Sequence, residues 1–322
     1  MDQHVNMELV QQRALLYLLN FLKQKHYRFT VITPLSHERI FMRKQNLPNE
    51  LRSLKDIFGW NLPFYPQDLD QRLFLILKNA HLIRIENQQW LSLVRVASLD
   101  DQLFIHSAFP TVETDAVFFG PDTYRFHYHL KQYLLTQPQT VKRSVELCCG
   151  ASPVAIAVAR LFPEMTEIFT ADINSKALFY SQINKKFLGA DNIFPTHSNL
   201  FSALEGDFDL IFANPPYLMD LHERQYRHGG NTLDGTDLSF NILTEGIKRL
   251  TPQGSLFLYT GIAISQDGNK FLQAVDHWMQ HYPDFKYSYE EIDPDVFGEE
   301  LEQPAYQHIE RIAIVLIKLS AA

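Results

Sequence analysis

The spacing of apolar and polar residues changes near residue 140. Beyond this point, short apolar runs alternate with segments of helical spacing. The runs are SVELCC, EIFTAD, NIFPTHS, FDLIFA and GSLFLYTG, which begin at residues 144, 167, 192, 208 and 254. Strands that alternate with helices of about 10–15 residues predict βαβ units and a doubly wound, mostly parallel sheet. Ligands of such α/β sheets bind beyond the carboxyl ends of the strands.

The first 140 residues show a mixed pattern. Apolar residues at helical spacing predict helices over 9–22, 49–58 and 67–78. Two strands are expected around a turn at residues 87–89, and a further strand over 102–109. Short helices followed by a hairpin are compatible with a winged-helix-like module, and equally with a general α+β cap.

The two patterns predict two domains. A Gly-Pro turn at Gly120 starts the segment FFGPDTYRFHYHLKQYLL, in which Asp122 or Thr123 is expected to cap a helix. The polar stretch TQPQTVKR that follows is interpreted as a linker. We therefore expect an α+β accessory or substrate-recognition domain over 1–140 and the α/β domain over 141–322.

Composition narrows the class of protein. The chain has 322 residues, of which 46% are apolar and 20% charged, and this is typical of a globular protein rather than a disordered or collagen-like one. Its two cysteines, Cys148 and Cys149, are adjacent, so a disulfide framework is excluded and a reducing compartment is expected. No apolar run approaches the ~18–20 residues of a membrane span, and no signal peptide is evident. We expect a soluble, cytoplasmic protein.

The formal charge of −8 is distributed unevenly. Residues 1–140 hold 15 basic and 13 acidic side chains, whereas residues 141–322 hold 14 basic and 24 acidic ones. Eight carboxylates fall within 290–310, which contains no Lys or Arg. A broad basic surface, the usual mark of a nucleic-acid-binding protein, is therefore missing.

Two motifs at predicted strand ends point to a cofactor. Glu146 begins the sequence ELCCGAS, whose small residues allow a sharp turn and close approach of a ligand to the backbone. Asp172 ends the next strand, where a carboxylate can accept hydrogen bonds from both ribose hydroxyls of an adenosine-containing cofactor. Taken singly, the first motif is also compatible with a plain strand-to-helix turn and Asp172 with a helix N-cap. A strict G-x-G-x-x-G is absent.

The most specific motif is Asn214-Pro215-Pro216-Tyr217, directly after the strand FDLIFA. The two prolines fix the backbone φ angles and remove two N–H donors, so that the carbonyl of Pro215 is held beside the Asn214 amide. Two acceptors then face a planar NH2 group, and Tyr217 can stack on the plane that carries it. The alternative is a simple strand terminator.

These motifs, in this order, resemble those of the class I S-adenosylmethionine-dependent methyltransferases that act on planar NH2 groups. Residues 141–322 are most similar to the protein-(glutamine-N5) methyltransferases that modify release factors, through ELCCGASPVAIAVA, TADINSKAL, SNLF, FDLIFANPPY, LDGTDL and LTPQGSLFL. The resemblance implies a seven-stranded sheet that ends in a β-hairpin, with Glu290–Asp295 near one strand and residues 311–319 in the other. The N-terminal domain is not matched, because that family has a small helical bundle there.

The resemblance also implies roles for individual residues. The implied cofactor-binding residues are Glu146, Cys148, Gly150, Ala151, Asp172, Ile173, Asn199, Leu200 and Asn214. The implied catalytic residues, which hold the target nitrogen, are Asn214, Pro215, Pro216 and Tyr217. Candidate substrate contacts are Asp122, Tyr124, Arg125 and Tyr217. Cys148 and Ser152 stand where the family usually has glycine, and Asn199 stands where it usually has an aspartate.

The expected function is direct transfer of a methyl group from S-adenosylmethionine to a side-chain amide of a protein, such as glutamine. Alternatives are an exocyclic amine of adenine or guanine in RNA or DNA, a small-molecule amine, and a non-catalytic cofactor-binding scaffold. The acidic half disfavours the nucleic-acid alternative, and an intact Asn-Pro-Pro-Tyr disfavours the scaffold. No metal is expected, because the adjacent cysteines lack the C-x-x-C spacing of a metal site. No membrane partner is expected either.

Overall fold

The computed structural model describes residues 2–45, 52–137 and 140–322. In the N-terminal part, the helices are α1 (Asp2–Gln24), α2 (Pro34–Gln45), α3 (Leu54–Phe58), the short 3-10 helix η1 (Pro66–Asp68) and α4 (Gln71–Asn79). The strands form two separate antiparallel hairpins, β1 (Ile83–Glu86) with β2 (Gln89–Ser92) and β3 (Val94–Leu99) with β4 (Gln102–Ser107). The expected α+β character is confirmed.

Details of this part differ from the sequence-based expectation. Helix α2 was not predicted, because its sequence PLSHERIFMRKQ is largely polar and its one buried side chain is His37. The apolar stretch that follows the turn at 87–89 forms two strands rather than one, because the extended structure is interrupted at Leu93, between β2 and β3. The expected helix over 49–58 begins only at Leu54, because Ser53 is its N-cap, and the predicted positions 49–51 lie outside the described residues.

The second part begins with α5 and consists of alternating strands and helices. Its helices are α5 (Pro121–Thr136), α6 (Pro153–Leu161), α7 (Ser175–Leu188), α8 (Asp237–Gly246) and α9 (Lys270–Met279), with 3-10 helices η2 (Ile247–Arg249), η3 (Gly298–Glu302) and η4 (Pro304–Tyr306). Its strands are β5 (Arg143–Leu147), β6 (Glu167–Asp172), β7 (Ile193–His197), β8 (Phe208–Ala213), β9 (Leu250–Ser265), β10 (Phe285–Asp293) and β11 (Ile309–Ala321). The bounds of β6 and β8 are those of the runs EIFTAD and FDLIFA.

These seven strands form one sheet in the order β10-β11-β9-β8-β5-β6-β7. Strands β5 to β9 are mutually parallel, whereas β11 is antiparallel to both of its neighbours, β9 and β10. The expected seven-stranded sheet with a closing hairpin is therefore confirmed. It is the fold class of the class I methyltransferases.

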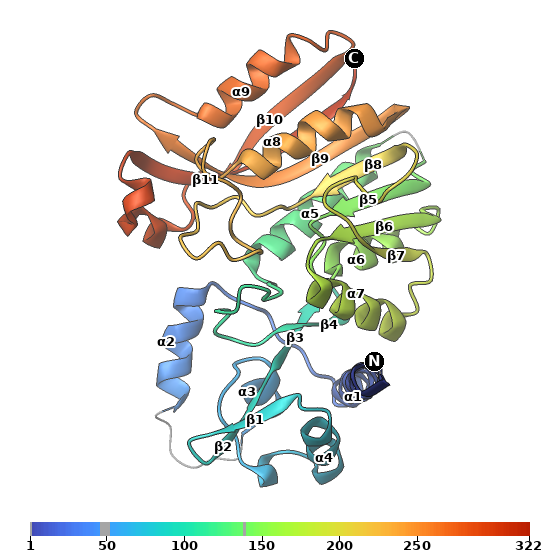
Figure 1. Cartoon of the computed structure of the whole chain (residues 1–322), viewed down its shortest axis with the longest axis vertical. Coiled ribbons are helices and arrows are strands. Elements are labelled where there is room, and N and C mark those ends of the chain that lie inside the picture. The colour runs from blue at the N-terminus through green and yellow to red at the C-terminus, as the bar shows by residue number, and fades with distance from the viewer. Residues whose placement is uncertain (1, 46–51, 138–139) are drawn as a thin grey trace.

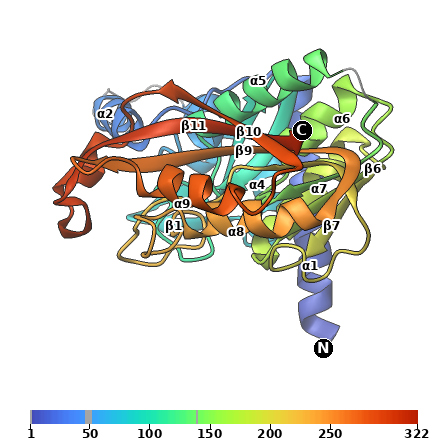
Figure 2. The same ribbon diagram turned by 90° about the horizontal axis from the view of Figure 1, so that it is seen from above.

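Helices cover both faces of this sheet. Apolar residues of α5, α6 and α7 belong to one buried cluster, and those of α8 and α9 to another on the opposite face. Figure 2 shows α5 on one side of β9 to β11 and α8 and α9 on the other. The strand order reverses between β5 and β8, because the chain runs outward from β5 through β6 to β7 and then returns to β8. A ligand is expected at this reversal.

The N-terminal elements lie at one end of the molecule, with α1 beside α7 (Figure 1). The larger apolar cluster continues from α1 and α4 through β3 and β4 into α6 and α7. Helix α5 also packs on the sheet, where Phe126 contacts the rings of Phe212, Phe257 and Tyr259. The division of the chain at residue 140 stays a prediction. None of the described helices is long and apolar enough to span a membrane.

Candidate functional site

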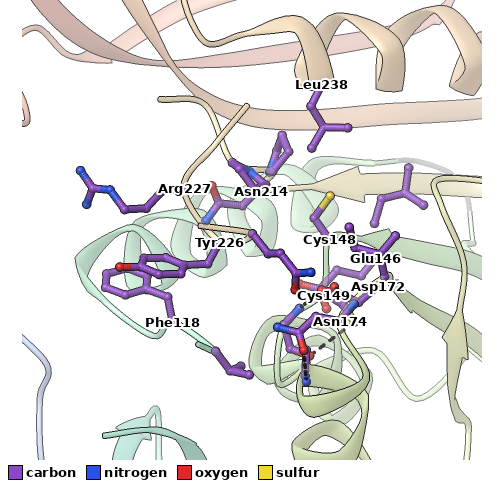
Figure 3. A pocket seen from close by; sticks show the side chains of 18 of the residues that line it. Phe118, Glu146, Cys148, Cys149, Asp172, Asn174, Asn214, Tyr226, Arg227 and Leu238 are labelled. Carbon is purple, nitrogen blue, oxygen red and sulfur yellow. Dashed lines mark hydrogen bonds between the residues drawn. The ribbon is translucent and has the colours of Figure 1, made fainter. Parts of the chain in front are cut away.

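A cavity lies at the carboxyl ends of β5, β6 and β8 (Figure 3). Most of the residues predicted from the sequence line it: Asp122, Glu146, Cys148, Gly150, Asp172, Ile173, Asn199, Leu200, Asn214, Pro215, Pro216 and Tyr217. Three do not. Ala151 is buried and does not line the cavity. Tyr124 accepts a hydrogen bond from Val31, and Arg125 pairs with Asp293. The structure thus brings residues from five separate segments to one place.

Glu146 lies near the end of β5 and is 4% exposed. One oxygen of its carboxyl group accepts a hydrogen bond of 3.1 Å from the backbone N–H of Ala155, in the first turn of α6. Burial raises the pKa of this carboxyl from 4.5 to about 8, and the neighbouring carboxylate of Asp172 adds to the shift. A buried carboxyl group of this kind is stabilised in its charged form by a cationic ligand.

Asp172, the last residue of β6, holds the turn that follows β5. Its two carboxylate oxygens accept hydrogen bonds of 2.9 Å from the N–H groups of Gly150 and Asn174. Burial raises the pKa of Asp172, and these backbone donors oppose the shift. Asn174, rather than Asp172, is the N-cap of α7, since its side chain accepts from the N–H groups of Lys176 and Ala177. The capping alternative for Asp172 is therefore wrong.

The turn between β5 and α6 has a left-handed backbone at three residues. Cys148, Gly150 and Ser152 have φ angles of 54°, 54° and 56°. Only glycine adopts this conformation without steric cost, which explains the usual preference for glycine at positions 148 and 152. The Ser152 hydroxyl compensates in part, because it lies 2.6 Å from the buried Ser181 hydroxyl in a hydrogen bond.

Beyond Asp172, the cavity is lined by Ile173, Asn199 and Leu200. The side chain of Ile173 is 50% exposed although it is large and apolar. Within the described part of the chain, no hydrogen bond joins the Asn199 amide to another protein group. An exposed apolar side chain beside a free amide is suited to a flat heteroaromatic ring with a polar edge.

Asn214, Pro215, Pro216 and Tyr217 follow β8 and form the opposite end of the cavity. Figure 3 shows Asn214 approaching from above, toward the space that Cys148, Glu146 and Asp172 border. Over the described residues, neither the Asn214 side chain nor the Pro215 carbonyl forms a protein hydrogen bond. Both acceptors are therefore free for a ligand that lies in the cavity.

Two glycines, Gly229 and Gly261, pack closely against this motif and hold it in place. Gly229 packs directly on it, since a Cβ at this position would lie 2.5 Å from the Pro216 carbonyl oxygen and 2.7 Å from the Cα of Tyr217. Gly261, on β9, leaves room for the ring of Tyr217, because a Cβ there would lie 2.4 Å from that ring. The HGGN sequence at 228–231 thus supports the backbone of the motif.

Several residues of the cavity were not predicted from the sequence. Phe118 precedes α5, and Tyr226 and Arg227 lie in the loop between β8 and α8. The rings of Phe118 and Tyr226 stack at 5.5 Å with an interplanar angle of 14°, and the Tyr226 hydroxyl donates to the Thr111 carbonyl. These aromatic side chains form a wall opposite the cofactor residues (Figure 3). No local pattern marks them, because their neighbours come from distant segments.

The acidic segment 290–310 borders the same cavity through Phe297, which lines it and contacts the ring of Tyr217 at 6.0 Å. Half of its eight carboxylates form ion pairs: Glu290 with Lys318, Glu291 with Arg311, Asp293 with Arg125, and Glu300 with Arg227. Asp295 and Glu299, on either side of Phe297 in sequence, are exposed. The negative charge of this segment, at the edge of the cavity, is therefore partly neutralised.

No metal site is apparent in the ranges that the structure describes, since they contain no group of three or more His, Cys, Asp or Glu side chains placed to hold an ion. The two cysteines are free, and burial raises the pKa of both thiols. They are therefore suited to packing rather than to nucleophilic chemistry.

Comparison with known proteins agrees with this geometry. The family model "Methyltransferase small domain" matches residues 130–266, a range that contains all five parallel strands. The predicted methyltransferase domain is therefore confirmed over this range.

The similar curated proteins act on glutamine. The ribosomal protein uL3 glutamine methyltransferase of Neisseria meningitidis serogroup B is 33% identical over 133 residues, which cover 38% of this chain and 44% of that protein. Its namesake in Xanthomonas campestris is 33% identical over 153 residues, 44% of this chain and 48% of that protein. The release factor glutamine methyltransferase of Borreliella burgdorferi is 27% identical over 132 residues, 38% of this chain and 46% of that protein. The chain spans less than half the length of each of these relatives.

Proposed function

We propose that this protein is an S-adenosylmethionine-dependent N-methyltransferase that methylates a side-chain amide of a protein, with glutamine N5 as the target atom. The observation that carries the proposal is the pair of unoccupied acceptors, Asn214 Oδ1 and the Pro215 carbonyl, at the end of a cavity whose other end presents Glu146 and Asp172. The glutamine methyltransferases that match the central part of the chain support the same target.

The residues of the cavity fit this cofactor. S-adenosylmethionine carries a cationic ammonium group, ribose hydroxyls and an adenine ring, and when bound it supplies an electrophilic methyl group. Glu146 is the buried carboxylate for the cationic end, and Asp172 has lone pairs left for the ribose hydroxyls. Ile173, Asn199 and Leu200 are placed for the adenine ring.

The target amide is then held by the chain's own acceptors. Asn214 Oδ1 and the Pro215 carbonyl accept the two N–H hydrogens, and the Tyr217 ring packs on the amide plane. The lone pair of an amide nitrogen is delocalised, so fixed acceptors that favour a pyramidal nitrogen increase its nucleophilicity. The nitrogen that gains the methyl group would lose one of its two protons to solvent, and S-adenosylhomocysteine would be the other product. Most of the acceleration comes from positioning and from preorganised dipoles, with no covalent enzyme intermediate.

The surroundings of the cavity favour a protein over a nucleic acid. Phe297 lines the cavity, and the exposed carboxylates of Asp295 and Glu299 lie two residues before and two residues after it in the sequence. Carboxylates at this rim repel phosphates and attract basic peptide segments. We further propose that residues 1–140 form an accessory domain that recognises the substrate.

The test uses labelled S-adenosylmethionine and a cell extract. After incubation, one half of the sample is digested with nuclease and the other with protease. We expect label that survives nuclease, is lost with protease, and is located on a glutamine side chain by mass spectrometry of the peptides that the protease releases. Label that is lost with nuclease instead would show that the target is a nucleic-acid base.

Replacement of Asn214 tests the site itself. Asn214→Ala should lower kcat by about a hundred-fold or more, because one of two acceptors for the reacting group is removed. Affinity for S-adenosylmethionine, measured by calorimetry, should change by less than about three-fold. The matched control is Asn241→Ala, at an exposed position on α8, which should leave both quantities unchanged. Full activity in Asn214→Ala would exclude the proposed role of the motif.

A further inference from the structure

A buried carboxylate outside the matched family region reaches the Asn-Pro-Pro-Tyr motif. Asp122 is 7% exposed and lies in the first turn of α5, whose N-cap is Gly120 and whose first residue is Pro121. Neither Asp122 nor Thr123, the two expected caps, is therefore the N-cap, and the Asp122 carboxylate is free for other contacts. The positive end of the helix dipole stabilises a carboxylate at this position.

The carboxylate of Asp122 accepts hydrogen bonds from two tyrosines. The hydroxyl of Tyr217 donates to Oδ2 at 2.6 Å, and that of Tyr259 donates to Oδ1 at 2.8 Å. Arg125, one turn further along α5, donates to Oδ1 at 3.2 Å and also pairs with Asp293 at 3.1 Å. The acceptor capacity of Asp122 is thus used within the protein, which leaves little for a substrate.

The ring of Tyr217 is enclosed on its other sides as well. Tyr259 and Gly261 are two residues apart on β9, so they face the same side of the sheet. Gly261 leaves space for the ring of Tyr217, and Phe297 contacts its edge at an interplanar angle of 65°. Because the Tyr217 hydroxyl is committed to Asp122, the part of Tyr217 that remains for the cavity is its ring.

We infer that Asp122 is a positioning residue that fixes the orientation of the Tyr217 ring through its hydroxyl, and that Tyr217 acts on the substrate through its ring face. The inference rests on the proposed function, since it assigns a means of orienting the target amide at the same site. It replaces the expected contact between Asp122 and substrate by a contact within the enzyme.

Four variants separate this role from a general structural one. Asp122→Ala and Tyr217→Phe each remove one partner of the same hydrogen bond, and each should lower kcat by about ten- to a hundred-fold, because a small misplacement of the ring misaligns the target. The double variant should be no slower than the slower single variant, since both remove one interaction. Tyr259→Phe removes the other hydrogen bond to Asp122 but leaves that of Tyr217, and its kcat should stay within about two-fold of the parent. Affinity for S-adenosylmethionine should be unchanged in all four.

A fluorine label provides a measurement that needs no activity. With 3-fluorotyrosine at position 217, the parent protein should show one narrow ¹⁹F resonance, which broadens or splits in Asp122→Ala and not in Tyr259→Phe. An unchanged resonance in Asp122→Ala, or additive losses of kcat in the double variant, would overturn the inference. If the parent protein methylates no protein at all, the proposed function fails, while the fluorine spectra still decide whether Asp122 fixes the ring.

Discussion

The two ends of the cavity are built in different ways. At the cofactor end, Glu146, Gly150 and Asp172 come from one strand-turn-helix-strand unit. Within it, the Asp172 carboxylate accepts from the Gly150 N–H at 2.9 Å, and the Glu146 carboxyl accepts from the Ala155 N–H at 3.1 Å. At the substrate end, Tyr217 is held by Asp122, 95 residues earlier in the chain, and by contacts with Phe297 and β9. The first end depends on local backbone geometry, and the second on how distant elements pack together.

The two ends also differ in charge. Carboxyl groups dominate the cofactor end, whereas the substrate end presents an amide, a carbonyl and aromatic rings. This contrast means that substitutions at the two ends should affect different measured quantities. A change at the cofactor end should alter cofactor affinity and its pH dependence, and a change at the substrate end should alter KM or kcat.

The largest effect on ligand binding is expected for Glu146→Gln. Glutamine can still accept the hydrogen bond from Ala155 but carries no charge, so affinity for the cationic cofactor should fall by about ten- to a hundred-fold in calorimetry. The control is Glu245→Gln, at an exposed position on α8, which should bind the cofactor normally. Unchanged affinity in Glu146→Gln would contradict the assignment of the cationic end of the cofactor to this carboxylate.

The same variant should change the pH dependence of stability. In the parent, the pKa of Glu146 is about 8 in the folded protein and 4.5 in the unfolded chain. Between these two pH values, the folded protein therefore keeps a proton that the unfolded chain has lost. The stability that Glu146 contributes is therefore fully present below pH 4.5 and is lost as the pH rises through 8. Because glutamine does not titrate, Tm should fall less between pH 5 and pH 8 in the variant without cofactor than in the parent.

An intermediate effect is expected for Phe297→Ala, at the substrate end. The substitution removes a ring that lines the cavity and contacts Tyr217, so KM for the protein substrate should rise by about five- to ten-fold. Cofactor affinity should remain within about two-fold, because Phe297 lies at the opposite end from Glu146 and Asp172. Phe194→Ala, a half-exposed ring on β7, is the control. Loss of cofactor affinity with unchanged KM would reverse the assignment of the two ends.

The smallest effect is expected for Cys148→Gly, which tests the local turn. Relief of the left-handed conformation at φ 54° favours the folded state by about 1–2 kcal/mol, while the greater freedom of glycine in the unfolded chain opposes it by about 0.5–1 kcal/mol. The free energy of unfolding in urea should therefore change by less than about 1 kcal/mol. Cys149→Gly, at a buried neighbour without a positive φ, should lose about 1 kcal/mol or more. Equal losses in both variants would show that the turn is not strained at residue 148.

The α/β half was predicted more completely than the N-terminal half. FDLIFA is a mostly apolar run directly before Asn214, and EIFTAD has an apolar interior and ends at Asp172; buried parallel strands have this signature. Helix α2 lacks an apolar stripe and buries His37 against the carbonyl of Trp60, so its sequence carries no comparable signal. β3 pairs with β4 rather than continuing β2 because the strand is interrupted at Leu93. The residue types around Leu93 do not indicate this interruption.

The sequence by itself determined the order of the strands and helices of the sheet, the turn at Cys148–Ser152, and the position of Asn214–Tyr217 after β8, since these depend on neighbouring residues and on backbone geometry. Only the tertiary structure decided that Asp122 holds Tyr217 instead of facing the substrate, that Phe118 and Tyr226 form a wall, and that half of the acidic segment is paired. Asp122 and Tyr217, which are 95 residues apart, meet only after α5 has packed on the sheet. The acidic segment forms its ion pairs only after β10 and β11 have joined the same sheet, and no local pattern specifies how these elements pack.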